Sequence, residues 1–175
     1  DHVAILSENS PGWWIAYLAV VRLGAVAVPI LPDLPESDVH HILTEMQVKV
    51  LFVTERLIEK IYELNSDLRG MVITLDDYET DGEVVAVTAF TTYLEEAVAA
   101  LRGDLEEPGF PLVEEDDIAS ILYTSGTSGF SKAVMLSHKN LASNAYAASQ
   151  LMVIEPGSTW LSILPMSHTY EFTCG

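Results

Sequence analysis

The sequence predicts an α/β protein with a largely parallel β-sheet flanked by helices. Two observations lead to this fold class. Short runs of β-branched and aromatic residues alternate along the chain with longer segments whose apolar residues recur at helical spacing, and this alternation is typical of parallel strands joined by helical crossovers. Several predicted strands are also apolar along their whole length, which indicates a sheet covered on both faces.

The alternation is clearest in the first half of the chain. A strand is expected at the N-terminus, and Ser10 and Pro11 then have the residue types of a helix N-cap and first helical position. That helix is expected to run to Leu23 and to end at Gly24, which can adopt the left-handed conformation. The elements expected next are a strand over 25–30, a helix opened by the capping-box pair Asp33 and Glu36, a strand over 48–53, a helix over 55–68 and a strand over 71–75.

The second half is less regular. Acidic residues, Gly and Pro dominate residues 76–117, most of which we interpret as a solvated excursion. One helix is expected there, over 92–101, with Thr92 and Glu95 as its capping box. The elements expected after it are strands over 118–123 and 133–137 and a helix capped by Ser137 that continues to about Met152.

Composition limits the function classes. The chain has 175 residues, 49% apolar, with 8 basic and 26 acidic side chains and a formal charge of −18. This apolar content argues against disorder and fits one domain. The negative charge argues against nucleic acid or an anionic membrane surface as the partner, because both would be repelled. A local pocket can still bind a small anion, since screening limits the field to roughly 8 Å.

The remaining composition signals concern the compartment. The single cysteine, Cys174, cannot form an internal disulfide, so we expect a reducing, cytoplasmic compartment, with peripheral membrane association of a longer protein as an alternative. The most apolar stretch, 13–31, is interrupted by Arg22, Gly24 and Pro29, so no transmembrane segment is expected. No basic N-terminal region marks a signal peptide.

One segment has the composition of a binding loop. Residues 123–132 read Tyr-Thr-Ser-Gly-Thr-Ser-Gly-Phe-Ser-Lys and follow a predicted buried strand directly. Glycines let backbone N–H groups approach a ligand, hydroxyls add donors, and the lysine adds a positive charge, so the segment suits an anion. A flexible Ser/Gly linker has a similar composition. The strands expected on both sides favour the binding loop.

Known loop spacings exclude several chemistries. A Walker A loop needs Gly before its Lys and Ser or Thr after it, whereas Lys132 lies between Ser131 and Ala133. A serine-hydrolase elbow needs glycine where Phe130 stands, and a Ser-x-x-Lys motif needs serine where Gly129 stands. A covalent serine nucleophile is therefore disfavoured. Phosphate binding by another kind of loop remains.

Residues 123–134 resemble the signature of the AMP-forming adenylating enzymes, which include acyl-CoA synthetases, luciferases and peptide-synthetase adenylation domains. That signature is an aromatic residue followed by Thr-Ser-Gly-Thr-Thr-Gly-x-Pro-Lys-Gly-Val, and this chain departs from it at Ser128, Ser131 and Ala133. Ser128 keeps the hydroxyl. The loss of proline at 131 and the added side chain at 133 affect the geometry of the loop.

Three further stretches are similar to the same family. Residues 3–13 and 23–32 look like the opening strand, helix and strand of the family's large N-terminal domain, and residues 164–171, Leu-Pro-Met-Ser-His-Thr-Tyr-Glu, look like its later histidine motif. The resemblance implies that residues 1–175 are part of that N-terminal domain. The rest of that domain and the mobile C-terminal domain are expected outside these residues.

The resemblance also implies a reaction. Such enzymes let a carboxylate attack the α-phosphate of ATP, which gives acyl-adenylate and pyrophosphate, and then pass the acyl group to a thiol such as coenzyme A. His168 would lie beside the reacting carboxylate, while Tyr170 and Glu171 are weaker candidates. The residues implied to hold the β- and γ-phosphates are Thr124, Ser125, Gly126, Thr127, Ser128, Gly129 and Lys132.

The same resemblance sets expectations for cofactors and substrate. The acidic residue that binds Mg²⁺, the ribose-binding aspartate and the catalytic lysine are expected outside residues 1–175, so no metal ligand is expected within them and the 175-residue chain alone is expected to be inactive. The motif at 164–171 looks most like medium- to long-chain fatty acyl-CoA synthetases. Alternatives are transfer to a carrier protein and a catalytically silent interaction module. Self-association is expected through apolar surface that further chain would cover.

Overall fold

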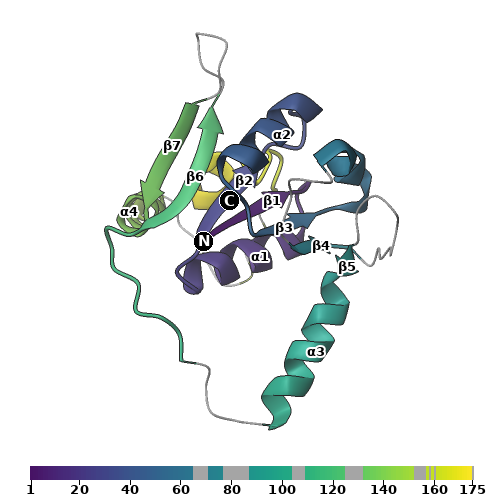
Figure 1. Cartoon of the computed structure of the whole chain (residues 1–175). Helices are drawn as coiled ribbons and strands as arrows, with labels where there is room; N and C mark the ends of the chain where they lie inside the picture. The colour runs from purple at the N-terminus through teal and green to yellow at the C-terminus, as the bar shows by residue number, and fades with distance from the viewer. Residues whose placement is uncertain are drawn as a thin grey trace.

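The structure, a computed structural model, describes residues 1–64, 71–76, 87–103, 109–124, 132–151, 157, 159 and 161–174. Within these residues one seven-stranded sheet has the order β5-β4-β3-β1-β2-β6-β7 (Figure 1). The strands are β1 (His2–Leu6), β2 (Val26–Ile30), β3 (Val50–Val53), β4 (Met71–Thr74), β5 (Thr88–Ala89), β6 (Ile118–Thr124) and β7 (Lys132–Ser137). The helices are α1 (Pro11–Arg22), α2 (Glu36–Glu45), the 3₁₀ helix η1 (Glu55–Leu64), α3 (Phe90–Gly103), α4 (His138–Leu151) and α5 (Thr169–Cys174).

The sheet is parallel except at one edge. Neighbouring strands from β5 to β6 pair in parallel, and only the last pair, β6 with β7, is antiparallel. The expected α/β fold with a largely parallel sheet is therefore confirmed. The carboxyl ends of six strands lie along one edge of the sheet, which is where open parallel sheets bind ligands.

Hydrophobic residues cover both faces of the sheet. Along β1, Ala4 and Leu6 pack under α2 and η1, whereas Val3 and Ile5 pack under α1. Successive residues of a strand point to opposite faces, so a strand that is apolar throughout must be covered twice. This arrangement explains the continuous apolar runs of the sequence.

The predicted ends of α1 are confirmed. The Oγ of Ser10 accepts a hydrogen bond from the Trp13 N–H at 3.1 Å, and Pro11 is the first helical residue. Gly24 follows the helix with φ of +68°, a conformation that residues with a Cβ rarely adopt. Both signals act within one turn of the chain.

The capping box expected at Asp33 and Glu36 is wrong. Helix α2 begins at Glu36, its N-cap is Pro35, and no side chain caps it. Leu34 precedes a proline and is thereby disfavoured in the helical region, which moves the start of the helix beyond Pro35. The Pro35 carbonyl accepts instead from the N–H groups of Asp38 and Val39.

Other elements differ from the sequence expectations in their bounds. Helix α3 begins at Phe90, so Thr92 lies inside its first turn rather than at its N-cap. The ring of Phe90 packs edge-on against Phe52, 6.4 Å between centroids, which ties the start of the helix to the sheet. Strand β5 lies in the segment interpreted as a solvated excursion, and only two residues form it. The helix expected over 55–68 is a 3₁₀ helix to Leu64, and the rest lies outside the described residues.

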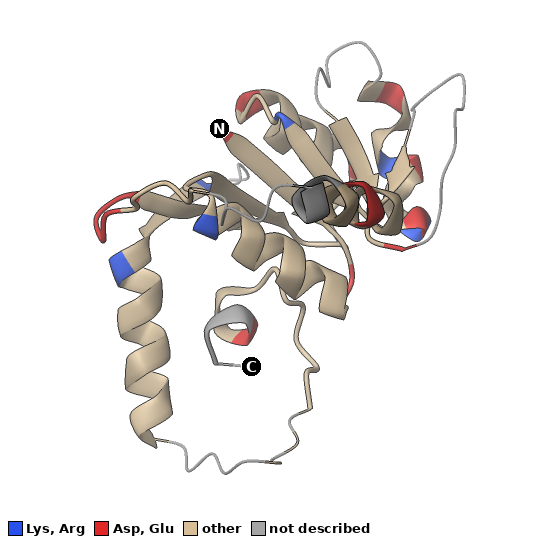
Figure 2. Ribbon diagram, turned by 90° about the horizontal axis from the view of Figure 1, so that it is seen from below, with Lys and Arg blue, Asp and Glu red and all other residues tan. Residues whose placement is uncertain are grey.

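Helix α4 has an exposed surface that is largely uncharged. Figure 2 shows α4 in tan beyond its first turn, because Lys139 is its only charged residue, and no residue of α4 is buried. Its Tyr146 and Leu151 are 69% and 87% exposed. No helix in the described part of the chain is long and apolar enough to cross a membrane.

Candidate functional site

A pocket at the carboxyl edge of the sheet contains residues that the sequence singled out. Its volume is about 250 Å³, and it lies where β2 and β6 end and where α5 begins. Thr124, the first residue of the predicted loop, and His168 both line it, although they are far apart in the sequence. The lining residues are Leu31, Leu34, Asp38, Leu122, Tyr123, Thr124, Ser167, His168 and Thr169.

A larger pocket, of about 680 Å³, lies elsewhere. It is formed by the end of α1 together with Phe110, Val113 and His138, and it contains no predicted site residue. Arg22 lies over the ring of Phe110, 4.3 Å from its centroid. The smaller pocket is therefore the candidate site, because it joins the two motifs.

The β6–β7 hairpin holds both ends of the loop. Thr124 pairs with Lys132 and Tyr123 with Ala133 in the antiparallel ladder. The Thr124 hydroxyl also donates to the Lys132 carbonyl, although at 3.5 Å. Between these pairs, the predicted site residues Ser125, Gly126, Thr127, Ser128 and Gly129 lie outside the described residues, as does Ser131.

The departure at Ala133 is accommodated by the strand. A Cβ strains the backbone only at positive φ. Among the described residues other than glycine, Gln47 alone has a positive φ, and Ala133 lies inside β7. The substitution of alanine for the signature glycine therefore introduces no backbone strain at this position.

The lysine at the end of the loop is exposed and unpaired within the described residues, where no carboxylate lies within ion-pair distance of it. Two other lysines have partners. Lys139 Nζ pairs with Glu115 at 2.8 Å, and Lys60 Nζ donates to the carbonyls of Pro32 and Leu34 at 2.6 and 2.7 Å. Among the described residues, the charge of Lys132 is thus not neutralised by an ion pair.

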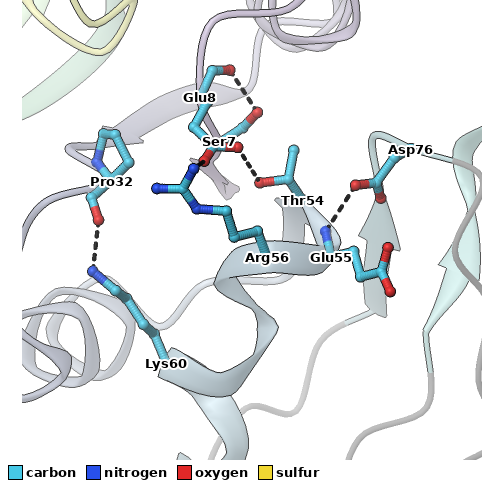
Figure 3. A network of polar contacts seen from close by, with 8 residues as sticks. All are labelled: Ser7, Glu8, Pro32, Thr54, Glu55, Arg56, Lys60 and Asp76. Atoms are coloured by element: carbon cyan, nitrogen blue, oxygen red, sulfur yellow. Dashed lines mark hydrogen bonds and ion pairs between the residues drawn. The ribbon is translucent and has the colours of Figure 1, made fainter.

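Polar contacts at the neighbouring strand ends are internal (Figure 3). Arg56 Nη1 lies 3.0 Å from Glu8 Oε1, and the Thr54 hydroxyl donates to Glu8 Oε2 at 3.4 Å. The Glu55 N–H donates to Asp76 Oδ2 at 2.9 Å. These groups join the ends of β1, β3 and β4 to η1, so we assign them to the fold rather than to a ligand.

His168 lies on a turn that fixes its ring. Its N–H donates to the Pro165 carbonyl at 2.8 Å, and the Tyr170 N–H donates to His168 Nδ1 at 3.3 Å. Because Nδ1 accepts a hydrogen bond, the proton of the neutral ring resides on Nε2. The exposed side chain can thus present an Nε2–H donor.

Asn9 positions the histidine segment, and the sequence analysis missed it. Its Nδ2 donates to the Leu164 carbonyl at 2.7 Å and to Ser162 Oγ at 2.9 Å. Its Oδ1 accepts from the Met166 N–H at 2.8 Å, and Met166 is buried against α1. A sequence signal existed, since Asn9 lies within the first stretch that resembles the family, but its long-range partners are visible only in the structure.

The weaker candidates lie apart from the pocket. The side chain of Tyr170 is 61% exposed, and Glu171 is buried, with its N–H donating to the His168 carbonyl at 3.0 Å. Neither lines the pocket. The described residues include no group of three side chains that could bind a metal ion.

Comparisons with known proteins match the whole chain. A family model described as AMP-binding enzyme matches residues 1–175. The 4-coumarate–CoA ligase-like 6 of Arabidopsis thaliana is 26% identical over 97% of this chain and 29% of its own length. Long chain acyl-CoA synthetase 8 of the same plant is 27% identical over 98% of this chain and 24% of its own length. The chain thus spans about a quarter to a third of these relatives.

Solved structures share the fold. ATP-bound MatB from Rhodopseudomonas palustris has a TM-score of 0.74 and 28% identity, over 99% of this chain and 32% of that one. A red-emitting luciferase from Phrixothrix hirtus has a TM-score of 0.83 at 20% identity, over 99% of this chain and 33% of the luciferase chain. The second likeness shows the fold alone.

Proposed function

Because this chain belongs to the AMP-binding enzyme family, we propose that the protein containing it activates a carboxylic acid with ATP to an acyl-adenylate and passes the acyl group to coenzyme A. Residues 1–175 are then part of the large N-terminal domain of an adenylating ligase. One observation carries the proposal: the pocket at the carboxyl edge of the sheet contains both Thr124 and His168, which belong to two separate family motifs.

The loop has the task of holding the leaving group. The β6–β7 ladder fixes Thr124 opposite Lys132, so the hydroxyl end and the cationic end of the loop lie side by side. Donors fixed in advance stabilise charge that develops on pyrophosphate, and one such donor contributes roughly 10²–10³ in rate. The residues assigned to the β- and γ-phosphates are Thr124, Ser125, Gly126, Thr127, Ser128, Gly129 and Lys132. The ATP-bound MatB neighbour supports a nucleotide as the ligand.

His168 acts on the reacting groups as a donor. A carboxylate needs no deprotonation to attack, so a general base is not required. The Nε2–H of His168 can instead donate to the carboxylate or to the α-phosphate and orient the two. Of the residues assigned to the site, it is the one proposed to be catalytic.

The proposed reaction also requires Mg²⁺, an acid substrate and coenzyme A. We assign the Mg²⁺ ligand to a residue beyond 1–175, and Mg²⁺ would neutralise phosphate charge there. For the acid, the motif at 164–171 favours a medium- or long-chain fatty acid. Several relatives are named as long-chain acyl-CoA synthetases or ligases, which supports this choice. The cytoplasm, with its coenzyme A, is the proposed location.

The 175-residue chain alone is proposed to be inactive and to self-associate. On this proposal it contributes the loop and His168, and the ribose and magnesium ligands belong to other parts of the protein. Exposed apolar side chains on α4, such as Leu151, and in the segment before the histidine motif, such as Leu161, give it a surface for self-association.

Pyrophosphate exchange tests this proposal. The full-length protein should incorporate labelled pyrophosphate into ATP only when a carboxylate is present, and the 175-residue chain should show no exchange. Exchange by the short chain would contradict the assignment of essential residues beyond it. Absence of exchange in the full-length protein, across carboxylates of varied length, would favour the catalytically silent module.

A further inference from the structure

Tyr123 joins the stem of the phosphate loop to helix α2. Its hydroxyl donates to Glu45 Oε2 at 2.5 Å. Its ring is 8% exposed and packs in the core beneath α2, on the face of the sheet that also contains Ile121. Glu45 is the last residue of α2. The residue immediately before Thr124 is therefore held by its backbone in the hairpin and by its hydroxyl on a helix.

The hydroxyl contributes something that the ring does not. A phenylalanine would fill the same core position, so packing alone does not require a tyrosine. Burial raises the pKa of the Tyr123 phenol and the nearby Glu45 carboxylate raises it further, so the phenol stays protonated and donates at neutral pH. A hydrogen bond to a charged acceptor is stronger than one between neutral groups.

Helix α2 borders the site at a second point. Asp38 of α2 lines the same pocket as Tyr123 and Thr124. The helix thus contributes to the pocket wall near its start and holds Tyr123 at its end. A shift of the end of β6 relative to α2 would therefore move Thr124, and the same shift would change the shape of the pocket.

We propose that Glu45 is a positioning residue for the phosphate loop, acting through its hydrogen bond with Tyr123. The bond fixes the end of β6 against α2 and so sets where the loop begins. The inference rests on the proposed function, because it requires the loop to bind the triphosphate of ATP. Displacement of preorganised donors by about 1 Å is costly for binding and rate.

The helix itself offers a matched control. Glu45 Oε2 lies 3.5 Å from His41 Nε2, and Glu36 Oε1 lies 3.5 Å from His40 Nε2, both at i,i+4 spacing. The two glutamates are 48% and 46% exposed, and of the two only Glu45 accepts a hydrogen bond from Tyr123. Glu36→Ala removes a glutamate–histidine contact of the same spacing without touching the stem of the loop.

The test is the ATP dependence of pyrophosphate release by the full-length protein. Tyr123→Phe and Glu45→Ala should each raise the KM for ATP about five-fold, the effect of one hydrogen bond. The double variant should be no worse than either single one, because both remove the same bond. Glu45→Gln, whose amide oxygen still accepts, should stay within about two-fold of wild type, and Glu36→Ala should not change the KM for ATP.

A purely structural role of the hydrogen bond predicts a different pattern. Tyr123→Phe and Glu45→Ala would then lower the melting temperature or the active fraction and leave the KM for ATP unchanged, which would overturn the inference. Additive losses in the double variant, or an effect of Glu36→Ala equal to that of Glu45→Ala, would overturn it as well. Failure of the proposed function is distinguishable, because the wild-type protein would then show no saturable dependence on ATP.

Discussion

Lys132 is the cation of the predicted loop, and no ion pair neutralises it within the described part of the chain. Lys60 and Lys139 are bound to carbonyls and to a carboxylate, whereas Lys132 stands exposed at the end of the loop without an acidic partner among the described residues. A cation already neutralised by the fold gives little to a ligand. The electrostatic contribution of the loop therefore depends on this one side chain.

Lys132→Ala in the full-length protein should lower the rate of adenylation by about 10²–10³, the effect of removing one preorganised charge stabiliser. Its melting temperature should stay near that of wild type, since Lys132 is exposed. Lys139→Ala, which removes an exposed ion pair one element later, serves as the control. Unchanged pyrophosphate release by Lys132→Ala at saturating ATP would count against the assignment.

The buried hydroxyl of Tyr17 makes the stability of the fold depend on pH in the alkaline range. Its ring stacks on Trp13, 5.1 Å between centroids, and is 4% exposed. Burial raises its pKa from 10.0 to about 12, although a hydrogen bond with Ser120 lowers it in part. Because the folded state keeps the proton longer than the unfolded state, the stability from this group is complete below pH 10 and is lost as the pH rises toward 12.

Denaturation at a series of pH values tests this. The unfolding free energy of the wild-type chain should fall by about 2 kcal/mol more between pH 10 and pH 12 than that of Tyr17→Phe. The unfolding free energy of Tyr17→Phe should still fall over this range, though by less than that of wild type, because burial and the Glu45 carboxylate also raise the pKa of Tyr123. Parallel pH profiles for the two proteins would show that Tyr17 does not carry the effect.

Residue types at the site were predictable, and their contacts were not. The composition of residues 123–132 indicates an anion-binding loop from sequence alone. Asn9 and Glu45 appear only in the structure, because their partners are distant in the chain. An ordinary Asn in a loop and an ordinary Glu on a helix carry no local signal of such contacts.

At the scale of elements, local capping signals succeeded when no neighbour competed. Ser10 caps α1 as expected, and Ser137 caps α4 with a reciprocal contact, since the Asn140 N–H donates to Ser137 Oγ and the Ser137 N–H donates to Asn140 Oδ1. Asp33 fails because Pro35 displaces the helix start. Strand β5 was missed because two residues give no periodic pattern.

Ser10→Ala should lower the unfolding free energy by about 1 kcal/mol, because it removes the acceptor for the Trp13 N–H at the start of α1. Ser10→Gly should cost only a few tenths of a kcal/mol. Urea denaturation monitored by tryptophan fluorescence measures both. Equal stability of Ser10→Ala and wild type would show that the cap is replaceable by water.

At the scale of the whole molecule, the formal charge of −18 and an anionic ligand are compatible. The loop from Thr124 to Lys132 contains no acidic residue, so the charge lies outside it. Screening confines the field of distant carboxylates to roughly 8 Å. The acidity therefore describes the solvated surface and not the ligand.

The exposed apolar side chains of α4 lead to a prediction about the isolated chain. The 175-residue chain should self-associate as its concentration rises, and Leu151→Lys should reduce this without lowering stability, since Leu151 is 87% exposed. Sedimentation velocity at several concentrations measures the association. A chain that stays monomeric throughout would contradict this prediction.

If the loop and His168 serve an AMP-forming reaction, as proposed, the products of ATP turnover must show it. The full-length protein should be incubated with ATP, Mg²⁺, coenzyme A and carboxylic acids of varied chain length, with the nucleotide products then separated. The protein should form AMP and pyrophosphate in equal amounts, only with an acid present and most rapidly with medium- or long-chain fatty acids. Formation of ADP and phosphate, or turnover independent of any acid, would contradict it.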